Sequence, residues 1–390
     1  MRRKMIFGTM TLIFTLLAGP ALAGPQEDLE ELGGLLYKDK KLSLNQNQSC
    51  KTCHDPSAGF ADPENLAEPV GFPVSDGSDP TLFGGRNAPS AAYAGFSPIF
   101  GWDATVGGYV GGMFWDGRAT GAALGDPLAE QALGPFLNPV EMAMTKESVV
   151  AAVAASKYVA LFRIVFPDTN FADVEGTYTH IGIAIAAFER STEVTRFNST
   201  FDDFWRACQD QGIDVSAVDT TTDLATLPDG ILTTTQLQGL ALFNDTGKGN
   251  CAACHPTTNY TDEAGTTYPP LFTDFSYDNL GLPTNPRVEE LSGVAPPDLG
   301  LGGELNDVNE DGKFKVPTLR NVAKSAPYGH NGYFPTLNEI VNFNNTRDVA
   351  MWDEPEVLTN LNTTELGNLG LTRQEEWQIV AFLKSLTDRK

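Results

Sequence analysis

The sequence predicts a mostly α-helical protein of two similar domains, and three observations predict it. The motif Cys-x-x-Cys-His occurs twice, at residues 50–54 and 251–255. A segment with helical periodicity precedes each copy, over 27–37 and 234–243, which indicates a loosely duplicated plan. No alternating pattern of any length predicts a substantial strand. The chain has 390 residues and is 41% apolar, which is enough for about two hydrophobic cores.

Between the two motifs the sequence predicts loops first and helices later. Gly and Pro punctuate residues 56–139, which predicts irregular structure with few regular elements. Helical periodicity returns over 146–166 and again over 178–190, whereas 219–229 is polar and rich in turn formers. We therefore expect two helical segments in this part of the chain.

Beyond the second motif we expect two more helices, over 337–343 and 373–386. Each begins at the spacing of a capping box, in which a Thr and a Glu or Gln three residues later satisfy each other's backbone donors. The same signature opens the segment 234–243. The three pairs are Thr233 with Gln236, Thr336 with Glu339, and Thr372 with Glu375.

Residues 1–23 are typical of a secretion signal. The basic residues Arg2-Arg3-Lys4 precede an apolar run over 5–17 and the small-residue box Ala21-Leu22-Ala23. So short a run does not cross a hydrocarbon core of about 30 Å, which disfavours a membrane anchor. We expect cleavage after Ala23 and export of the mature chain to the periplasm, with no later membrane span.

The charge balance excludes several classes of partner. Lys and Arg number 26 against 50 Asp and Glu, for a formal net charge of -24. Such an excess of negative charge repels nucleic acid and anionic lipid surfaces. A protein partner that used charge to dock would therefore have to be cationic.

The two Cys-x-x-Cys-His motifs are the attachment pattern of c-type haem. Two thiols bond the porphyrin edge and the adjoining His ligates the iron. A redox Cys-x-x-Cys or half a zinc site is the alternative, but both copies end in His and no further Cys pair supplies zinc ligands. We therefore predict two covalently bound haem c groups, held by Cys50, Cys53 and His54 and by Cys251, Cys254 and His255.

Each motif is expected to define one cytochrome c-like domain. We place the boundary near residues 191–199, so that 24–192 forms the N-terminal haem domain and 193–390 the C-terminal one. The fold class is thus mostly α, with one haem in each domain.

Several blocks outside the motifs carry a family resemblance. In order they are Phe114-Trp115-Asp116-Gly117-Arg118, Gln131-Ala132, Gly134-Pro135, Asn138-Pro139-Val140-Glu141-Met142 and Lys315-Val316-Pro317-Thr318-Leu319-Arg320-Asn321-Val322. Together they resemble the dihaem cytochrome c peroxidase and MauG family, including its MbnH-like members. The resemblance extends from about residue 32 to 386. It implies that the first haem reacts with hydrogen peroxide and that the second transfers electrons.

The resemblance also implies roles for four residues. Peroxide activation needs an acid/base group and a hydrogen-bond donor over an open iron face, and Glu141 and Gln131 match those positions, with Pro135 nearby. Trp115 matches an indole that relays electrons between the haems. Without the resemblance, a solvated Glu, a capping Gln and an ordinary core Trp would be the simpler interpretations.

A calcium ion between the haems is implied in the same way. Asn87 and the backbone carbonyls of Ser325 and Pro327 match oxygen ligands of the kind that Ca²⁺ prefers. An Asn bonded to its own turn is the alternative for Asn87. The acidic run 307–312 imitates part of an EF-hand loop, but a solvated turn is favoured there.

The histidine count bears on the first haem. Many peroxidases of the family close this haem with a loop His, yet no His occurs between His54 and His180. His180 lies in a predicted helix and His330 matches no axial position. We therefore expect a permanently open first haem, as in the MauG branch.

The far ligand of the second haem must differ from the tyrosine of some relatives. Asn344 occupies the matching position, and a carboxamide is a poor iron ligand. Met351 follows in a nearby loop, so the sequence predicts His255/Met351 ligation, with an open or water-filled face as the rival.

The residues leave three functions open. The first is oxidation of an aromatic residue on a partner protein by peroxide, and the missing loop His favours it. The second is a cytochrome c peroxidase supplied by a small cytochrome or copper protein, and the third is a simple electron carrier, which Glu141 and Gln131 disfavour. The surface residue through which electrons would pass is also undetermined, and the unranked candidates are Trp102, Trp205, Trp352 and Trp377.

Overall fold

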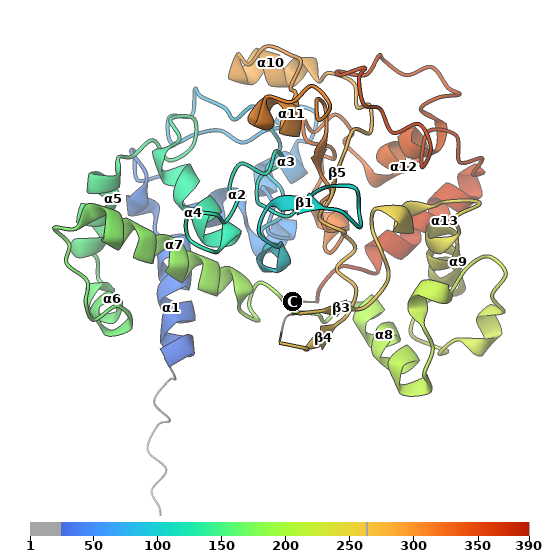
Figure 1. Cartoon of the computed structure of the whole chain (residues 1–390), viewed down its shortest axis with the longest axis horizontal. Helices are drawn as coiled ribbons and strands as arrows, with labels where there is room; N and C mark the ends of the chain where they lie inside the picture. Colours follow the sequence, from blue (N-terminus) through green and yellow to red (C-terminus); the bar gives the residue numbers. More distant parts are fainter. Residues whose placement is uncertain (1–24, 263, 390) are drawn as a thin grey trace, which may run out of the picture.

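The computed structural model describes residues 25–262 and 264–389, so the predicted secretion signal lies outside the described residues. Most helices of the N-terminal half lie on the left and most of those of the C-terminal half on the right, with loops and short strands between them, whereas the helices over 286–292 and 300–305 lie at the top near the middle (Figure 1). The first group comprises α1 (Pro25–Lys38), α2 (Cys50–Cys53), α3 (Pro63–Ala67), α4 (Pro127–Leu137), α5 (Lys146–Ala154), α6 (Val159–Val165) and α7 (Val174–Arg190).

The second group of helices follows residue 199. It comprises α8 (Thr200–Gln211), α9 (Thr234–Asn244), α10 (Pro286–Ser292), α11 (Gly300–Leu305), α12 (Leu337–Thr346) and α13 (Arg373–Lys384). The strands are two or three residues long and form antiparallel pairs, as the lack of a strand pattern predicted. The pairs are β1 (Gly101–Asp103) with β2 (Gly108–Val110), β3 (Tyr260–Thr261) with β4 (Thr267–Tyr268), and β5 (Tyr277–Asp278) with β6 (Phe314–Lys315).

The predicted helices before both motifs and near the C-terminus are confirmed, and capping boxes begin α9 and α13. At α12 the Thr336 hydroxyl accepts from the Glu339 backbone and donates to the Glu339 carboxylate, so the cap forms without the reciprocal backbone bond of a full box. The segment 146–166 divides into α5 and α6, which meet at 102°. The loop expected over 56–139 contains α4, which the sequence pattern did not predict. Pro127 at its first turn, Gly134 and Pro135 weaken the helical pattern, while the Asp126 side chain caps its N-terminus.

The helix before each motif crosses the last helix of its half through a glycine. Gly33 of α1 lies against the Ala184 carbonyl of α7, and Gly239 of α9 lies against the Gln378 carbonyl of α13. A Cβ atom at either glycine would meet that carbonyl and would also come within 2.8 Å of a Phe Cβ four residues further on. The two crossings are therefore equivalent, as a duplicated plan requires.

Buried side chains form two large clusters. One is drawn from residues 32–194 with Leu271, and the other from residues 201–386. Each cluster packs around one pair of crossing helices, α1 with α7 or α9 with α13. The domain boundary between residues 192 and 193 stays a prediction, because loops of each half also contact the other half.

A buried arginine joins the two halves. Arg320 donates to both carboxylate oxygens of Asp202, at 2.9 Å and 3.2 Å, and to the Pro270 carbonyl. Its guanidinium also lies over the rings of Tyr93 and Phe197, at 4.8 Å and 4.5 Å. Planar Arg suits such a site because it can pair with a carboxylate and stack on rings at once.

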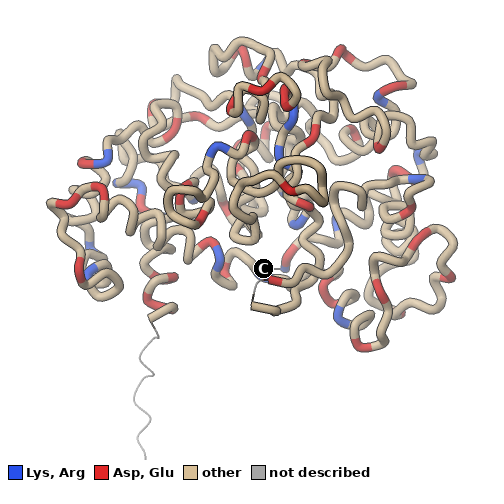
Figure 2. The backbone as a smooth tube through the Cα atoms, in the orientation of Figure 1, with Lys and Arg blue, Asp and Glu red and all other residues tan. Residues whose placement is uncertain are grey.

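The acidic residues that give the chain its net charge are spread along the fold. Asp and Glu positions occur along the backbone of both halves in Figure 2. Among the described residues, no single helix is long and apolar enough to cross a membrane; only α5 and α6 taken together, as a bent pair, reach the length and composition.

Gly239→Ala should destabilise the protein by about 1–3 kcal/mol, because the new methyl group must displace backbone of α13. Thermal unfolding of the haem-loaded protein measures the effect. Gly303→Ala is the matched control, since Gly303 is exposed on α11 and its Cβ would meet only Leu299, at 3.3 Å. Equal unfolding temperatures for the two variants would contradict the tight crossing.

Candidate functional site

The first Cys-x-x-Cys-His motif folds as one short helix. Cys50 and Cys53 lie on the single turn of α2, and the Ser49 side chain caps it with Thr52 in a capping box. His54 follows directly, and its Nδ1 lies 3.1 Å from the Phe60 carbonyl. This hydrogen bond orients the ring and leaves Nε2 for a metal. Burial lowers the pKa of His54, which favours the neutral imidazole that ligation needs.

The second motif repeats this arrangement. Cys251 begins a 3-10 turn after Asn250, whose φ of 50° places it in the left-handed region. The Nδ1 atom of His255 lies 2.8 Å from the Phe272 carbonyl, and burial again lowers the pKa of the imidazole. Both motifs therefore present two thiols and one oriented imidazole.

A cavity of about 310 Å³ opens beside the second motif. Cys251, Cys254 and His255 line it on one side, and one face of α12 lines it on another. That face consists of Leu337, Ile340, Val341 and Asn344, at the spacing of one helix face. Largely apolar walls, two thiols and an imidazole fit a covalently attached haem.

Asn344 provides an independent sign that a group belongs in this cavity. Its Oδ1 is buried and has no hydrogen-bond partner among the described residues. A buried unpaired acceptor is costly, so such an atom usually marks the position of a partner outside the chain.

Trp115 lies along the same cavity as His255. Its Nε1 donates to the Asn87 carbonyl at 2.9 Å, and its own carbonyl accepts from the Lys315 backbone at 2.8 Å. Both contacts come from segments distant in sequence. Asn87 thus orients the indole, while the backbone of Trp115 is tied to the C-terminal half of the chain.

The three predicted calcium residues also come together here. Asn87, Ser325 and Pro327 all line the cavity. Asn87 is buried, and its Nδ2 donates to the Pro73 carbonyl at 2.9 Å, which fixes the orientation of the amide. The arrangement is compatible with an oxygen-rich cation site, and occupation by calcium stays a prediction.

Glu141 lies in a separate cleft with Phe114 and Arg118. Its Oε1 accepts from Asn138 Nδ2 at 2.6 Å. Burial raises the pKa of the carboxyl above its ordinary value, although Asn138 and Arg118 oppose the shift. A carboxyl with a raised pKa holds its proton to higher pH than an ordinary Glu and is a better proton acceptor when ionised, which suits an acid/base residue.

Gln131 and Pro135 lie one helical turn apart on α4, just before Glu141. The Pro135 carbonyl accepts from the Met142 backbone at 3.1 Å, which ties the Glu141 turn to the helix. The loop before α4 is held by Glu130, whose carboxylate accepts from the backbone of Gly121, Ala123 and Leu124. This ordered loop forms part of the surroundings of the cleft.

The predicted His255/Met351 ligation is wrong in this structure. Met351 is fully exposed and does not line the cavity, whereas Asn344 does. The reason is the turn after α12: buried Arg347 donates to the carbonyls of Leu280 and Asn362 and directs the following loop outward. The sequence position of Met351 could not show this long-range anchor.

The two remaining histidines are engaged elsewhere, as predicted for His180. Its ring stacks on Phe166 with centroids 4.2 Å apart, and its Nδ1 lies 3.3 Å from the Thr169 hydroxyl. His330 stacks on Phe314 at 3.6 Å and pairs with Glu356 at 3.2 Å. Neither ring is available as a loop ligand for the first haem in this arrangement.

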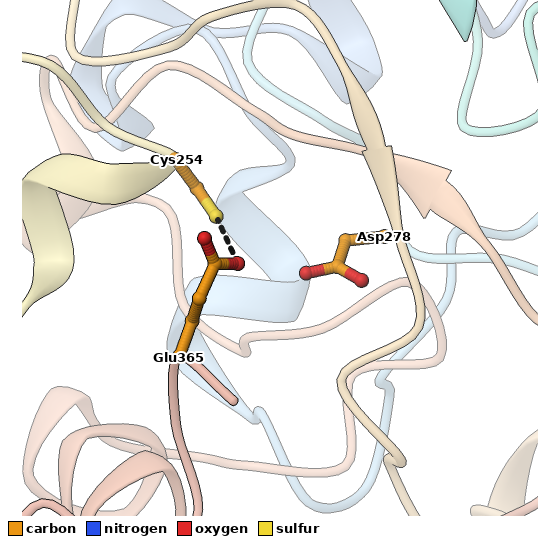
Figure 3. Close-up of side chains that lie close together, drawn as sticks. All are labelled: Cys254, Asp278 and Glu365. Atoms are coloured by element: carbon orange, nitrogen blue, oxygen red, sulfur yellow. Dashed lines mark hydrogen bonds between the residues drawn. The ribbon is translucent and has the colours of Figure 1, made fainter. Parts of the chain in front are cut away.

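Two carboxylates that the sequence pattern did not reveal lie beside the second motif. Glu365 points toward Cys254, and Asp278 faces them from β5 (Figure 3); Cys254 Sγ is 3.9 Å from Glu365 Oε2. Asn362 Nδ2 donates to both carboxylates, at 2.5 Å and 2.6 Å, and burial raises the pKa of Asp278. Haem attachment would consume the Cys254 thiol, so the cluster belongs to the haem surroundings.

A buried lysine and a buried glutamate were not predicted either. Lys315 Nζ donates to the Ser97 hydroxyl and the Gly112 carbonyl and has no carboxylate partner among the described residues; burial lowers its pKa to about 7. Glu189 of α7 lies near Cys50, and burial raises its pKa to about 8. Lys315 begins one of the family blocks, but nothing in the local sequence of either residue signals burial.

Comparison with known proteins agrees with this geometry. The di-haem cytochrome c peroxidase family model matches residues 27–210. Methylamine utilization protein MauG of Paracoccus denitrificans is 36% identical, covering 94% of this chain and 91% of that protein. Cytochrome-c peroxidase IdrP2 of Denitromonas iodatirespirans is 28% identical, covering 94% and 84%. The diheme peroxidase BthA Y463M variant of Burkholderia thailandensis superposes with a TM-score of 0.72 at 31% identity, covering 93% and 86%.

Fold and site together define an oxidoreductase of the di-haem peroxidase class, which acts on hydrogen peroxide. The chain belongs to the di-haem cytochrome c peroxidase family, and the family implies two haem c groups.

Met351→Ala should leave the absorption and electron paramagnetic resonance spectra of both haems unchanged, because the Met351 side chain is in solvent. Asn344→Met is the informative companion, since it places a thioether on the α12 face that lines the cavity. We expect it to produce the near-infrared band of sulfur-to-iron ligation. Loss of such a band on Met351→Ala would contradict the structure.

Proposed function

We propose that this protein is an exported, periplasmic dihaem oxidase that uses hydrogen peroxide to oxidise a Trp or Tyr of a partner protein. The observation that carries the proposal is the engagement of both spare histidines, His180 and His330, by stacking and hydrogen bonds. With no His to close it, the first haem would be open to peroxide at all times. The similarity to MauG, at 36% identity, supports the same branch.

The chain's own residues supply proton transfer and orientation in this proposal. Bound to His54, a haem would supply an iron that takes electrons from the protein and passes them to peroxide. Glu141 accepts the peroxide proton and returns it to the departing oxygen, because its raised pKa suits both steps. Gln131 orients the peroxide, and Pro135 limits the space around it.

Trp115 would carry electrons between the haem sites. The hydrogen bond from its indole to Asn87 links it to the residues proposed for calcium, Asn87, Ser325 and Pro327. A Ca²⁺ ion there would hold the loops from both halves at a fixed separation. His255 would hold the second haem in the cavity that Asn344 also lines, where the unpaired oxygen of Asn344 could accept a hydrogen bond from a bound group.

A cytochrome c peroxidase is the second candidate function. The excess of acidic residues, present on both halves in Figure 2, suits a cationic small cytochrome as electron donor. The same surface suits a cationic partner protein, so charge alone does not separate the two functions.

With peroxide, the holoprotein should oxidise a partner protein and should oxidise a reduced small cytochrome only slowly. In the test, the holoprotein and peroxide are mixed in turn with each exported protein encoded by neighbouring genes. Mass spectrometry then detects an oxidised Trp or Tyr. The oxidised holoprotein alone should show a high-spin haem signal by electron paramagnetic resonance. Two low-spin haems, or fast oxidation of a reduced small cytochrome with no modified partner, would favour the peroxidase instead.

Glu141→Gln should slow the reaction with peroxide by about 10²–10⁴-fold, the usual contribution of a general acid/base. In the unmodified protein the rate should fall as the pH drops through the raised pKa of Glu141, because only the deprotonated carboxylate accepts the peroxide proton. Stopped-flow absorption measures both effects. Glu147→Gln, at an exposed position on α5, is the control, and an unchanged rate and pH profile in Glu141→Gln would contradict the assignment.

A further inference from the structure

A chain of aromatic rings leads inward from the protein surface. Trp102 lies on β1 with 59% of its surface exposed, and its ring meets Tyr109 of β2 edge-on at 5.3 Å. Tyr109 stacks on Phe100 at 5.1 Å with an angle of 2° between the planes. Phe100 then meets the buried ring of Tyr277 at 5.9 Å. Each separation lies within the contact range of about 4.5–7 Å for aromatic pairs.

The inner end of this chain lies against the loop of Trp115. The Tyr277 hydroxyl and the Phe100 ring both contact Gly117, two residues after Trp115, where an added Cβ would collide with the hydroxyl. Tyr277 also pairs with Lys315 in the β5–β6 ladder, and the Lys315 backbone donates to the Trp115 carbonyl at 2.8 Å. Covalent and hydrogen-bonded links therefore connect the rings to Trp115.

The other candidate tryptophans lack one of these features. Trp377 is 51% exposed but contacts no aromatic ring in the described part of the chain. Trp205 and Trp352 are half-buried, and their indoles donate to Asn259 and Thr346. Trp102 alone of these four combines an exposed indole with a tyrosine neighbour that leads inward.

We propose that Trp102 is the surface terminus of the electron route into the haem pair, with Tyr109, Phe100 and Tyr277 as the path to Trp115. The proposal rests on the peroxide-driven oxidation proposed above. Trp102 gives up an electron toward the haem pair and releases its indole proton to water, which the exposed ring allows. A donor outside the protein, an aromatic side chain of the partner, then returns an electron to Trp102, and water returns the indole proton.

Without a donor, oxidation along the same route should modify Trp102 covalently. Each peroxide takes two electrons and two protons and becomes two waters. If Trp102 supplies both electrons, water adds one oxygen to the indole, and the two protons released balance those consumed. Peptide mapping by mass spectrometry detects that added oxygen.

The experiment treats the holoprotein with peroxide in the absence of any partner or reductant. We expect added oxygen at Trp102 and several-fold less at Trp377, whose similar exposure makes it an internal control. Tyr109→Phe keeps the ring stack but removes the tyrosine relay, so oxidation of Trp102 should fall several-fold while that of Trp377 stays constant. The haem spectra of Tyr109→Phe before peroxide should match those of the unmodified protein.

The outcomes separate this route from the underlying function. Equal oxidation of Trp102 and Trp377 would show attack governed by exposure and would overturn the route. So would a haem spectrum that responds to peroxide while Trp102 stays unmodified, although the proposed function would survive that result. Haem spectra that do not respond to peroxide would overturn both.

Discussion

Two glycine crossings set the geometry on which the rest of this protein depends. Gly33 and Gly239 let α1 and α9 touch the backbones of α7 and α13, where any side chain would hold the helices apart. Each crossing helix precedes a Cys-x-x-Cys-His turn, with residues 39–49 or 245–250 between them, so the crossing helps to set where the thiols and imidazole lie relative to their core. Close packing then transmits small changes at the crossing to the site.

The link between the halves is polar and aromatic rather than purely apolar. Buried Arg320 needs the Asp202 carboxylate, because an unpaired buried charge would be strongly destabilising. Its guanidinium also stacks on Tyr93, which brings a ring of the N-terminal half against a residue of the C-terminal half, and on Phe197 near the boundary. Tyr93 lines the same cavity as Asn87 and Trp115, so these loops lie close to this junction, and the bond to the Asn87 carbonyl gives the indole a defined orientation.

Buried polar groups in unusual environments gather where a cofactor would bind. Among the described residues, Asn344 has a buried acceptor without a hydrogen-bond partner and Lys315 a buried amine without a carboxylate partner, while burial raises the pKa of the Glu141 carboxyl. A fold that only needed stability would replace such groups or pair them. Their common placement along the cavity and the nearby cleft is the physical mark of a site that works with electrons and protons.

The sequence by itself determined what is encoded locally. Adjacent thiols and imidazole, capping boxes and helical periodicity act within a few residues, so the two motifs, α9, α12 and α13 could be predicted. Which of Met351 and Asn344 lines the cavity beside His255 could not be predicted. Bonds between distant segments, such as that from Arg347 to the Leu280 carbonyl, decide it. The aromatic path from Trp102 and the buried state of Lys315 likewise arise only when separate loops pack together, since burial and contact between remote residues are properties of the tertiary structure alone.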